Sequence, residues 1–200
     1  PCFEWLTGVI GQFMLAMPDI DVDIVQKFQF TGLEGLLNHH IDVLITPDFV
    51  KKEKIIYETL AEYQLVILVS GDHPMAEVSH LTPEQLAKET LLTFPVSIER
   101  LDILTYFLTP SHLKPEKLKQ IESLEIMLQM TALKRGVCVL PEWLADLKNK
   151  DHNLRNVRVG KKGLFQELFL AMREPDGTIP YIGKFIAIGR EKANNTSVTR

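Results

Sequence analysis

The sequence predicts an α/β fold in two lobes, because short apolar strands alternate with helices of about ten residues in two successive stretches, 1–70 and 75–160. Composition changes abruptly at 70–74 and again at 149–163, where charged residues, glycine or proline replace apolar ones. A chain that crosses between lobes at both places leaves a cleft between them. We therefore expect two Rossmann-like lobes with a central cleft.

The first stretch begins with a helix over residues 3–17, where apolar residues recur at helical spacing until Pro18. Residues 20–25, IDVDIV, alternate apolar and acidic residues and predict a strand. TGLE at 31–34 has the spacing of a capping box, so a second helix is expected to start there and run to about residue 39. Residues 41–46, IDVLIT, are apolar on both faces, which is typical of a central parallel strand covered by helices.

The second stretch repeats this alternation after a strand at 65–69, LVILV. TPEQ at 82–85 places Thr82 at a helix N-cap, Pro83 at the first helical position and Gln85 at the third. The remaining expected elements are strand 91–94, a helix that carries Leu101, Leu104, Phe107 and Leu108 and ends at Pro110, strand 117–122, a helix from Ser123 to near Gly136, and strand 137–141.

The two crossings set the expected lobe boundaries. Residues 1–70 with 164–190 are predicted to form lobe I, and residues 71–163 lobe II. In lobe I, a strand within LFQELFLAM follows the return crossing and a last helix starts at Pro180. The polar segment 191–200, EKANNTSVTR, is predicted to be a disordered tail.

The charge balance argues against direct DNA binding by these 200 residues. Lys and Arg total 22 against 26 Asp and Glu, and the net charge of −4 has the wrong sign for a surface that grips phosphates. Hydrophobic residues make up 46% of the chain, enough for a sizeable core.

The cysteines indicate a reducing compartment, so we expect a cytoplasmic protein. Cys2 and Cys138 fit neither a disulfide framework nor metal-ligand spacing. No apolar run approaches the roughly 18 residues of a membrane-spanning helix. The chain begins at Pro1 rather than Met, so we expect that an N-terminal portion, with any leader it carried, has been removed.

Polar residues follow several predicted strands, where ligands bind in open parallel sheets. Thr46 follows the strand at 41–46, Thr93 and Pro95 follow the strand at 91–94, and the loop 28–31 follows the strand at 20–25. Their joint placement predicts that they line one cleft. The alternative for each is that Thr and Pro merely end strands and cap helices.

Charged and small polar residues in the second lobe extend this candidate site. Arg100 lies at a predicted helix start. Its guanidinium either forms a bidentate hydrogen bond with a ligand carboxylate or pairs with neighbouring acidic residues. Ser123 and Glu125 open the next helix, where Ser123 caps and Glu125 either complements the helix dipole or accepts a ligand ammonium. Cys2, at a helix start, is either a thiol of lowered pKa or a small buried hydrophobe.

No enzyme signature is present. The sequence lacks GxSxG, GxxxxGK[ST], GxGxxG and HExxH, and its six histidines have no metal-ligand spacing. We therefore expect no catalysis, no cofactor and no metal.

Three blocks, LEIMLQMTALKRGVCVLP, IDVLIT and LVILVSGDHP, resemble the effector-binding domain of LysR-type transcriptional regulators. The resemblance covers nearly the whole chain. PCFEWL, LLTFPVSIERLDI and KRGVCVLPEWLA are similar to the members that control methionine biosynthesis genes and respond to homocysteine.

This resemblance implies a fold like that of type II periplasmic binding proteins, with a small effector, here homocysteine, between the lobes. It further implies a homodimer through this domain, in which the domains pair antiparallel and edge to edge, and a tetramer at full length. DNA would be bound by a removed N-terminal winged helix-turn-helix. RNA polymerase would be a further partner, and no contact with a membrane is expected. The effector-contact positions that it implies are Cys2, Phe28, Phe30, Thr31, Thr46, Thr93, Pro95, Ser97, Arg100 and Ser123, with Glu125 beside them.

Two features bear on this reading. Many relatives place small Ser or Thr residues where this chain has Phe28 and Phe30, which favours an organic effector over a bare inorganic anion.

The same two-lobed body also serves solute-binding proteins that deliver small amino-acid-like ligands to transporters. The upstream sequence would separate the two, since a helix-turn-helix indicates a regulator and a signal peptide a carrier. An enzyme is the third alternative, for which no nucleophile and base can be named.

Overall fold

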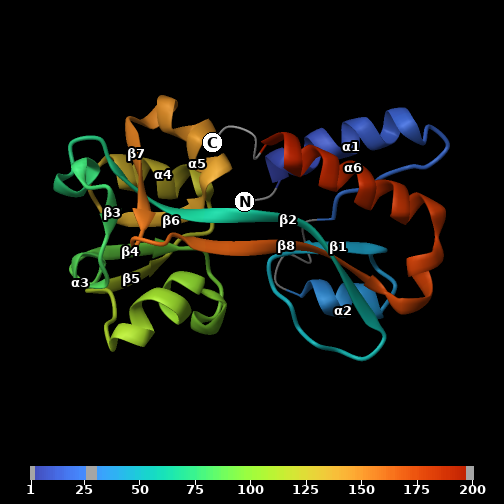
Figure 1. Cartoon of the computed structure of the whole chain (residues 1–200), viewed down its shortest axis with the longest axis horizontal. Coiled ribbons are helices and arrows are strands. Elements are labelled where there is room, and N and C mark those ends of the chain that lie inside the picture. The colour runs from blue at the N-terminus through green and yellow to red at the C-terminus, as the bar shows by residue number, and fades with distance from the viewer. Residues whose placement is uncertain (1–2, 26–30, 197–200) are drawn as a thin grey trace. The chain divides into compact units, whose positions relative to one another are not determined.

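The computed structural model describes residues 3–25 and 31–196 and divides the chain into two compact units. Unit 1 is Tyr63–Gln166, and unit 2 contains the residues before and after it (Figure 1). The chain passes between the units within strand β2 (Ile55–Ser70) and within strand β8 (Leu164–Arg173). The predicted lobe boundaries, at residues 70 and 163, fall at the end of β2 and just before β8. They differ from the observed crossings because a change in composition marks the end of a strand, whereas the chain crosses within each strand.

Unit 2 is built on the first half of β2 and most of β8. Strand β1 (Val43–Thr46) pairs antiparallel with β8, which lies beside β2. Helix α2 (Gly32–Leu37) packs on β1 and contributes the buried Leu36 to the core. Helices α1 (Phe3–Ala16) and α6 (Pro180–Thr196) lie side by side (Figure 1).

The α1–α6 contact is made by aromatic and apolar side chains. The rings of Phe13 and Phe185 meet edge to face with centroids 5.3 Å apart, a geometry that adds to the hydrophobic gain. Helix α6 continues through Thr196, which includes most of the segment 191–200 for which composition predicts disorder, and residues 197–200 lie outside the described residues.

Unit 1 contains a mixed sheet whose central strand β2 is buried on both faces. Strand β4 (Thr90–Thr93) lies parallel to β5 (Lys117–Gln120) on one side and to β6 (Val137–Pro141) on the other. The second half of β2 pairs antiparallel with β6 and with β7 (Leu154–Val159). The remaining elements are β3 (His80–Leu81), which pairs parallel with β7, and helices α3 (Pro83–Leu86), α4 (Leu124–Ala132) and α5 (Glu142–His152).

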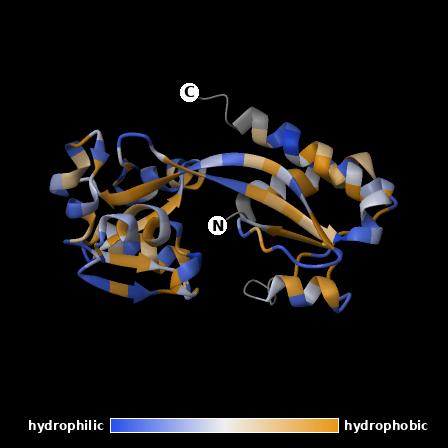
Figure 2. Ribbon diagram, turned by 60° about the horizontal axis from the view of Figure 1, so that its bottom comes forward, coloured by the Kyte–Doolittle hydropathy of each residue, from blue (hydrophilic) through white to orange (hydrophobic). Residues whose placement is uncertain are grey.

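Successive residues of β2 in unit 1 belong to different core clusters. Ile67 and Val69 pack in one cluster, and Val66 and Leu68 pack in the other. Because side chains alternate across a strand, the central strand is covered on both faces, which explains its continuous apolar sequence (Figure 2).

Two predicted helix starts of unit 1, at Thr82 and Ser123, are confirmed. Thr82 Oγ1 accepts a hydrogen bond from the Gln85 backbone N–H at 3.3 Å, and Gln85 Oε1 accepts from the Thr82 N–H at 2.9 Å. Ser123 Oγ accepts from the Ile126 N–H at 3.4 Å and caps α4. Strands 91–94, 117–122 and 137–141 are also found, each with slightly different ends.

Two strand predictions for the first stretch are wrong. Strand β1 is antiparallel, pairs only with β8 among the described strands and is mostly half-buried, so it is not a central parallel strand. Residues 21–25 form no strand with any part of the chain that the structure describes. An apolar pattern reports which faces are covered, whereas strand direction and pairing depend on neighbours that the pattern does not specify.

Three further differences concern local structure. Thr31 precedes α2 without a side-chain cap, so the capping box predicted at 31–34 does not form. The helix expected to run from near Arg100 to Pro110 is replaced by two 3₁₀ segments that flank a π-helical segment, Ile103–Leu108. Strand β7 was not predicted, because its exposed arginines, Arg155 and Arg158, gave the segment the composition of a loop.

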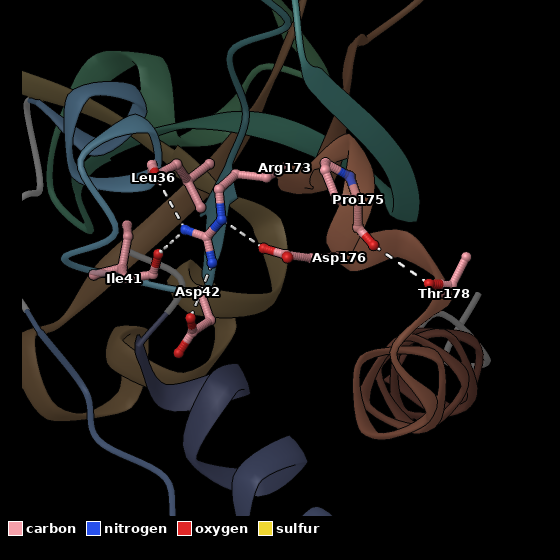
Figure 3. A network of polar contacts seen from close by, with 7 residues as sticks. All are labelled: Leu36, Ile41, Asp42, Arg173, Pro175, Asp176 and Thr178. Atoms are coloured by element: carbon pink, nitrogen blue, oxygen red, sulfur yellow. Dashed lines mark hydrogen bonds and ion pairs between the residues drawn. The ribbon is translucent and has the colours of Figure 1, made fainter.

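In unit 2, the buried side chain of Arg173, the last residue of β8, links three elements (Figure 3). Arg173 Nη1 donates to the backbone carbonyls of Leu36 at 2.8 Å and Ile41 at 2.7 Å. Its Nη2 lies 3.0 Å from Asp42 Oδ1, and its Nε lies 2.6 Å from Asp176 Oδ2. One guanidinium therefore joins the end of α2, the start of β1 and the turn before α6.

Replacing Arg173 with Ala is expected to lower the free energy of unfolding by about 3 kcal/mol, because buried carbonyls and a carboxylate lose their partner. Urea unfolding followed by circular dichroism measures this change. Arg190 is the matched control: it also bonds a carboxylate and a carbonyl in unit 2 but is 47% exposed. Arg190→Ala is expected to cost less than about 1 kcal/mol, and equal effects of the two changes would contradict the role given to Arg173.

Candidate effector-binding site

In unit 1, Thr93 stands at the carboxyl end of β4 with its side chain buried. It is 6% exposed, and its Oγ1 has no hydrogen-bond partner within the described residues. Its backbone carbonyl accepts from the Ile121 N–H at 2.8 Å, so the strand end itself is fixed. A buried hydroxyl without a partner is rare in folded proteins and costs stability, which makes Thr93 a candidate for binding a ligand atom.

The loop after Thr93 is braced by the neighbouring strand. Gln120, at the end of β5, pairs with Thr93 in the parallel ladder, and its Nε2 donates to the Val96 carbonyl at 3.2 Å. Pro95 is half-buried in this loop, while Ser97 and Arg100 are exposed. Gln120 was not singled out from the sequence, because a polar residue at the end of an exposed strand gives no signal of such a brace.

The start of α4 contributes Ser123 and Glu125. Ser123 uses its hydroxyl oxygen as the N-cap, which leaves its proton available. Glu125 is 62% exposed, and its carboxylate lies 3.2 Å from Lys148 Nζ and 3.6 Å from His152 Nε2. A ligand ammonium would therefore compete with two cationic side chains for Glu125. Arg100 is likewise engaged in an interaction within the chain, so its alternative as a paired surface arginine stays open.

Unit 1 thus brings together most of the residues predicted for the second lobe. Thr93, the loop 94–100 and the N-terminus of α4 all follow the carboxyl ends of the parallel strands β4 and β5. Hydroxyl groups and free helix N–H groups at such an edge favour anionic oxygen atoms.

In unit 2, Thr46 ends β1 and is 8% exposed. Its Oγ1 accepts from the Asp48 N–H at 3.1 Å, which orders the turn after the strand. A hydroxyl that accepts one bond still has its own proton to donate. Thr31 is exposed, and Cys2, Phe28 and Phe30 lie outside the described residues.

Nearby, Tyr57 supports the loop that follows Thr46. Its hydroxyl donates to the Val50 carbonyl at 2.9 Å, and its ring packs against that of Phe49 with centroids 4.8 Å apart and the ring planes tilted by 47°. Burial, together with the negative charge of Asp48, raises the pKa of Tyr57, so the hydroxyl stays a donor at neutral pH.

The thiol of Cys138 lies in the core of unit 1. It is fully buried, and burial raises its pKa to about 12. The described residues contain no cluster of three or more His, Cys, Asp or Glu side chains that could hold a metal ion. No helix in the same ranges is long and apolar enough to cross a membrane.

The sequence matches the family model described as the LysR substrate binding domain over residues 1–194. The chain therefore belongs to this family, and the predicted fold class, type II periplasmic-binding-protein-like, is confirmed.

Within the family, the chain is similar to MetR proteins. It is 29% identical over 192 residues to the HTH-type transcriptional regulator MetR of Escherichia coli (strain K12), which covers 96% of this chain and 60% of the relative. The regulatory domain of MetR from N. meningitidis, described as a LysR family regulator, is 30% identical with a TM-score of 0.84, covering 98% of this chain and 90% of that one. The effector binding domain of BenM, solved with its effector benzoate, shares the fold at 19% identity and a TM-score of 0.77, covering 98% and 88% of the two chains. This chain thus spans about 60% of the length of its curated relatives.

Replacing Thr93 with Val is expected to leave the unliganded protein equally stable or up to about 1 kcal/mol more stable, because it removes a buried hydroxyl that has no partner. Thr131→Val is the control, since Thr131 is also fully buried but donates to the Met127 carbonyl at 2.9 Å; we expect it to destabilise by about 1 kcal/mol. Thermal unfolding of both variants measures the difference. Clear destabilisation by Thr93→Val would show that the hydroxyl is satisfied in the folded protein.

Cys138 is expected to resist modification in the native protein, because its raised pKa keeps the thiol protonated and its burial blocks the reagent. Iodoacetamide treatment at about pH 8 followed by peptide mass spectrometry should label Cys138 only after unfolding in urea. Rapid labelling of Cys138 in the folded chain would contradict its placement in the core.

Proposed function

We propose that this chain is the effector-sensing domain of a LysR-type transcription regulator of methionine biosynthesis genes, and that its effector is homocysteine. Support comes first from the similarity to MetR proteins, which extends over nearly the whole chain and holds in both sequence and structure. The observation that carries the binding role is the buried, unpartnered hydroxyl of Thr93 at the carboxyl edge of a parallel strand pair.

The chemistry of homocysteine suits the candidate residues. Its carboxylate would accept hydrogen bonds from Thr93, from Thr46 and from the fork of Arg100. Its ammonium would be bound by Glu125, in competition with Lys148 and His152. Phe28 and Phe30, outside the described residues, are proposed from the sequence alone as the apolar wall for the thiol-bearing arm.

The proposed regulator acts without covalent chemistry. Effector contacts to residues of both units would favour one arrangement of the domain over another. A homodimer formed through this domain, and a tetramer at full length, would pass that change to DNA-binding domains elsewhere in the protein, and from there to RNA polymerase. The proposed location is the cytoplasm.

Isothermal titration of L-homocysteine into this chain tests the effector. We expect saturable binding, and we expect Thr93→Val and Arg100→Ala each to weaken it at least about tenfold, the effect of losing a hydrogen bond to a charged group. Arg158→Ala is the control. This exposed arginine lies on β7 of the same unit, and β7 is distant in sequence from the candidate residues.

L-Methionine serves as the ligand control, since it carries the same carboxylate and ammonium but a methylated sulfur. No heat up to about 1 mM homocysteine would reject the effector. Binding that survives the Thr93 and Arg100 changes would reject these residues while keeping the effector.

A further inference from the structure

Three parts of the candidate site in unit 1 are fixed by neighbouring residues at the end of β5. The backbone N–H of Ile121 donates to the Thr93 carbonyl at 2.8 Å, which fixes the end of β4. The hydroxyl oxygen of Ser123 caps α4. The side chain of Gln120 reaches the loop that follows β4, where its Nε2 donates to the Val96 carbonyl at 3.2 Å. The strand end, the loop and the helix start are therefore tied to one short segment.

The backbone of Gln120 is a rigid base for its side chain. Gln120 is the register partner of Thr93 in the parallel ladder between β4 and β5. The next residue, Ile121, is 8% exposed and packs in the core cluster that contains Leu92 and Leu128. Because the ladder and the core already hold this backbone, only the side chain of Gln120 loses freedom when it bonds the loop.

The loop that Gln120 restrains, residues 94–97, has no regular secondary structure. Pro95 has no N–H to donate, and inside the loop the Val96 N–H donates to the Phe94 carbonyl at 2.8 Å. A bond between residues i and i+2 closes a tight turn but does not tie that turn to the rest of the unit. The Gln120 amide supplies such a tie from the neighbouring strand.

The position of this loop decides where Arg100 lies. Arg100 ends the short 3₁₀ segment Ile98–Arg100, and its backbone N–H donates to the Ser97 carbonyl at 3.1 Å. Ser97 directly follows Val96, so a displacement of the Val96 carbonyl passes along the backbone to Arg100. A guanidinium binds a carboxylate in bidentate fashion only when its plane is correctly oriented, so the orientation of this segment affects binding.

We propose that Gln120 is a positioning residue for effector binding, whose side-chain amide holds the loop 94–97 so that Arg100 is oriented for the effector carboxylate before the effector arrives. The inference rests on the function proposed above and adds a residue that contacts the loop rather than the effector. A loop that is ordered in advance spares the effector the entropic cost of ordering it. Since Gln120 is exposed, its hydrogen bond contributes more to this order than to the stability of the fold.

Replacing Gln120 with Met tests this role, because Met has a similar length but cannot donate a hydrogen bond. Gln120→Met is expected to weaken L-homocysteine binding about fivefold in isothermal titration, the effect of losing one neutral hydrogen bond. Thermal unfolding is expected to be unchanged. Gln120→Lys restores an N–H donor and is expected to return the affinity to near the wild-type value.

Gln129 provides the matched controls, because it is an exposed glutamine in the second half of α4 in the same unit. Gln129→Met makes the same chemical change away from the loop, and Gln129→Lys adds the same charge as Gln120→Lys. Both variants are expected to bind L-homocysteine like the wild type.

A double-mutant cycle tests whether Gln120 acts through Arg100. In an Arg100→Ala background, Gln120→Met is expected to weaken binding further by less than about twofold, because there is no guanidinium left to orient. In a Thr93→Val background the full fivefold effect is expected to remain, since the end of β4 is fixed by Ile121 and not by Gln120.

Nitrogen-15 relaxation of the unliganded chain gives a readout that needs no effector. Backbone order parameters of residues 96–100 are expected to be near about 0.85 in the wild type and to fall in Gln120→Met. Gln120→Lys is expected to restore them, and Gln129→Met to leave them unchanged.

The outcomes separate this inference from the proposed function. A wild-type chain that binds no L-homocysteine would reject the effector and, with it, this role of Gln120. A wild-type chain that binds, with Gln120→Met binding equally well, would reject the positioning role and keep the effector. Equal losses in the Arg100→Ala and Thr93→Val backgrounds, no recovery in Gln120→Lys, or unchanged order parameters in Gln120→Met would reject it as well.

Discussion

The long strand β2 is the element on which the rest of the structure depends. Its 16 residues serve both units, since the chain passes from one to the other within it. In unit 1 its backbone is paired on both sides, by β6 and β7, and its side chains are buried on both faces. Buried backbone groups must be hydrogen bonded, so in unit 1 strand β2 cannot change its register against β6 and β7 without breaking both ladders.

That burial accounts for the candidate site at the end of the parallel strands. The ladder satisfies the backbone of β4 up to Thr93, where Ile121 supplies the last hydrogen bond, but it offers nothing to the Thr93 side chain. An unpartnered hydroxyl lowers stability in the free protein and becomes useful when a ligand atom reaches it. Gln120 then holds the following loop in place from the neighbouring strand.

In unit 2, helix α2 and strand β1 pack around a cluster of buried side chains that includes Leu36. Arg173 adds to this packing by bonding two carbonyls and two carboxylates at once. Arginine suits the position because its planar fork presents several donors in fixed directions. The arrangement places the start of β1, and through it Thr46, on a rigid base.

The sequence by itself determined the fold class and the helix starts at Thr82 and Ser123, because capping residues and apolar periodicity act over a few neighbouring residues. It also identified Thr93 and Ser123, which follow a strand and open a helix. Only the tertiary structure decided that β1 is antiparallel, that residues 21–25 have no partner among the described strands and that Gln120 and Arg173 act as braces. Those features depend on residues distant in sequence, and strand pairing and side-chain reach are fixed by packing that no local pattern contains.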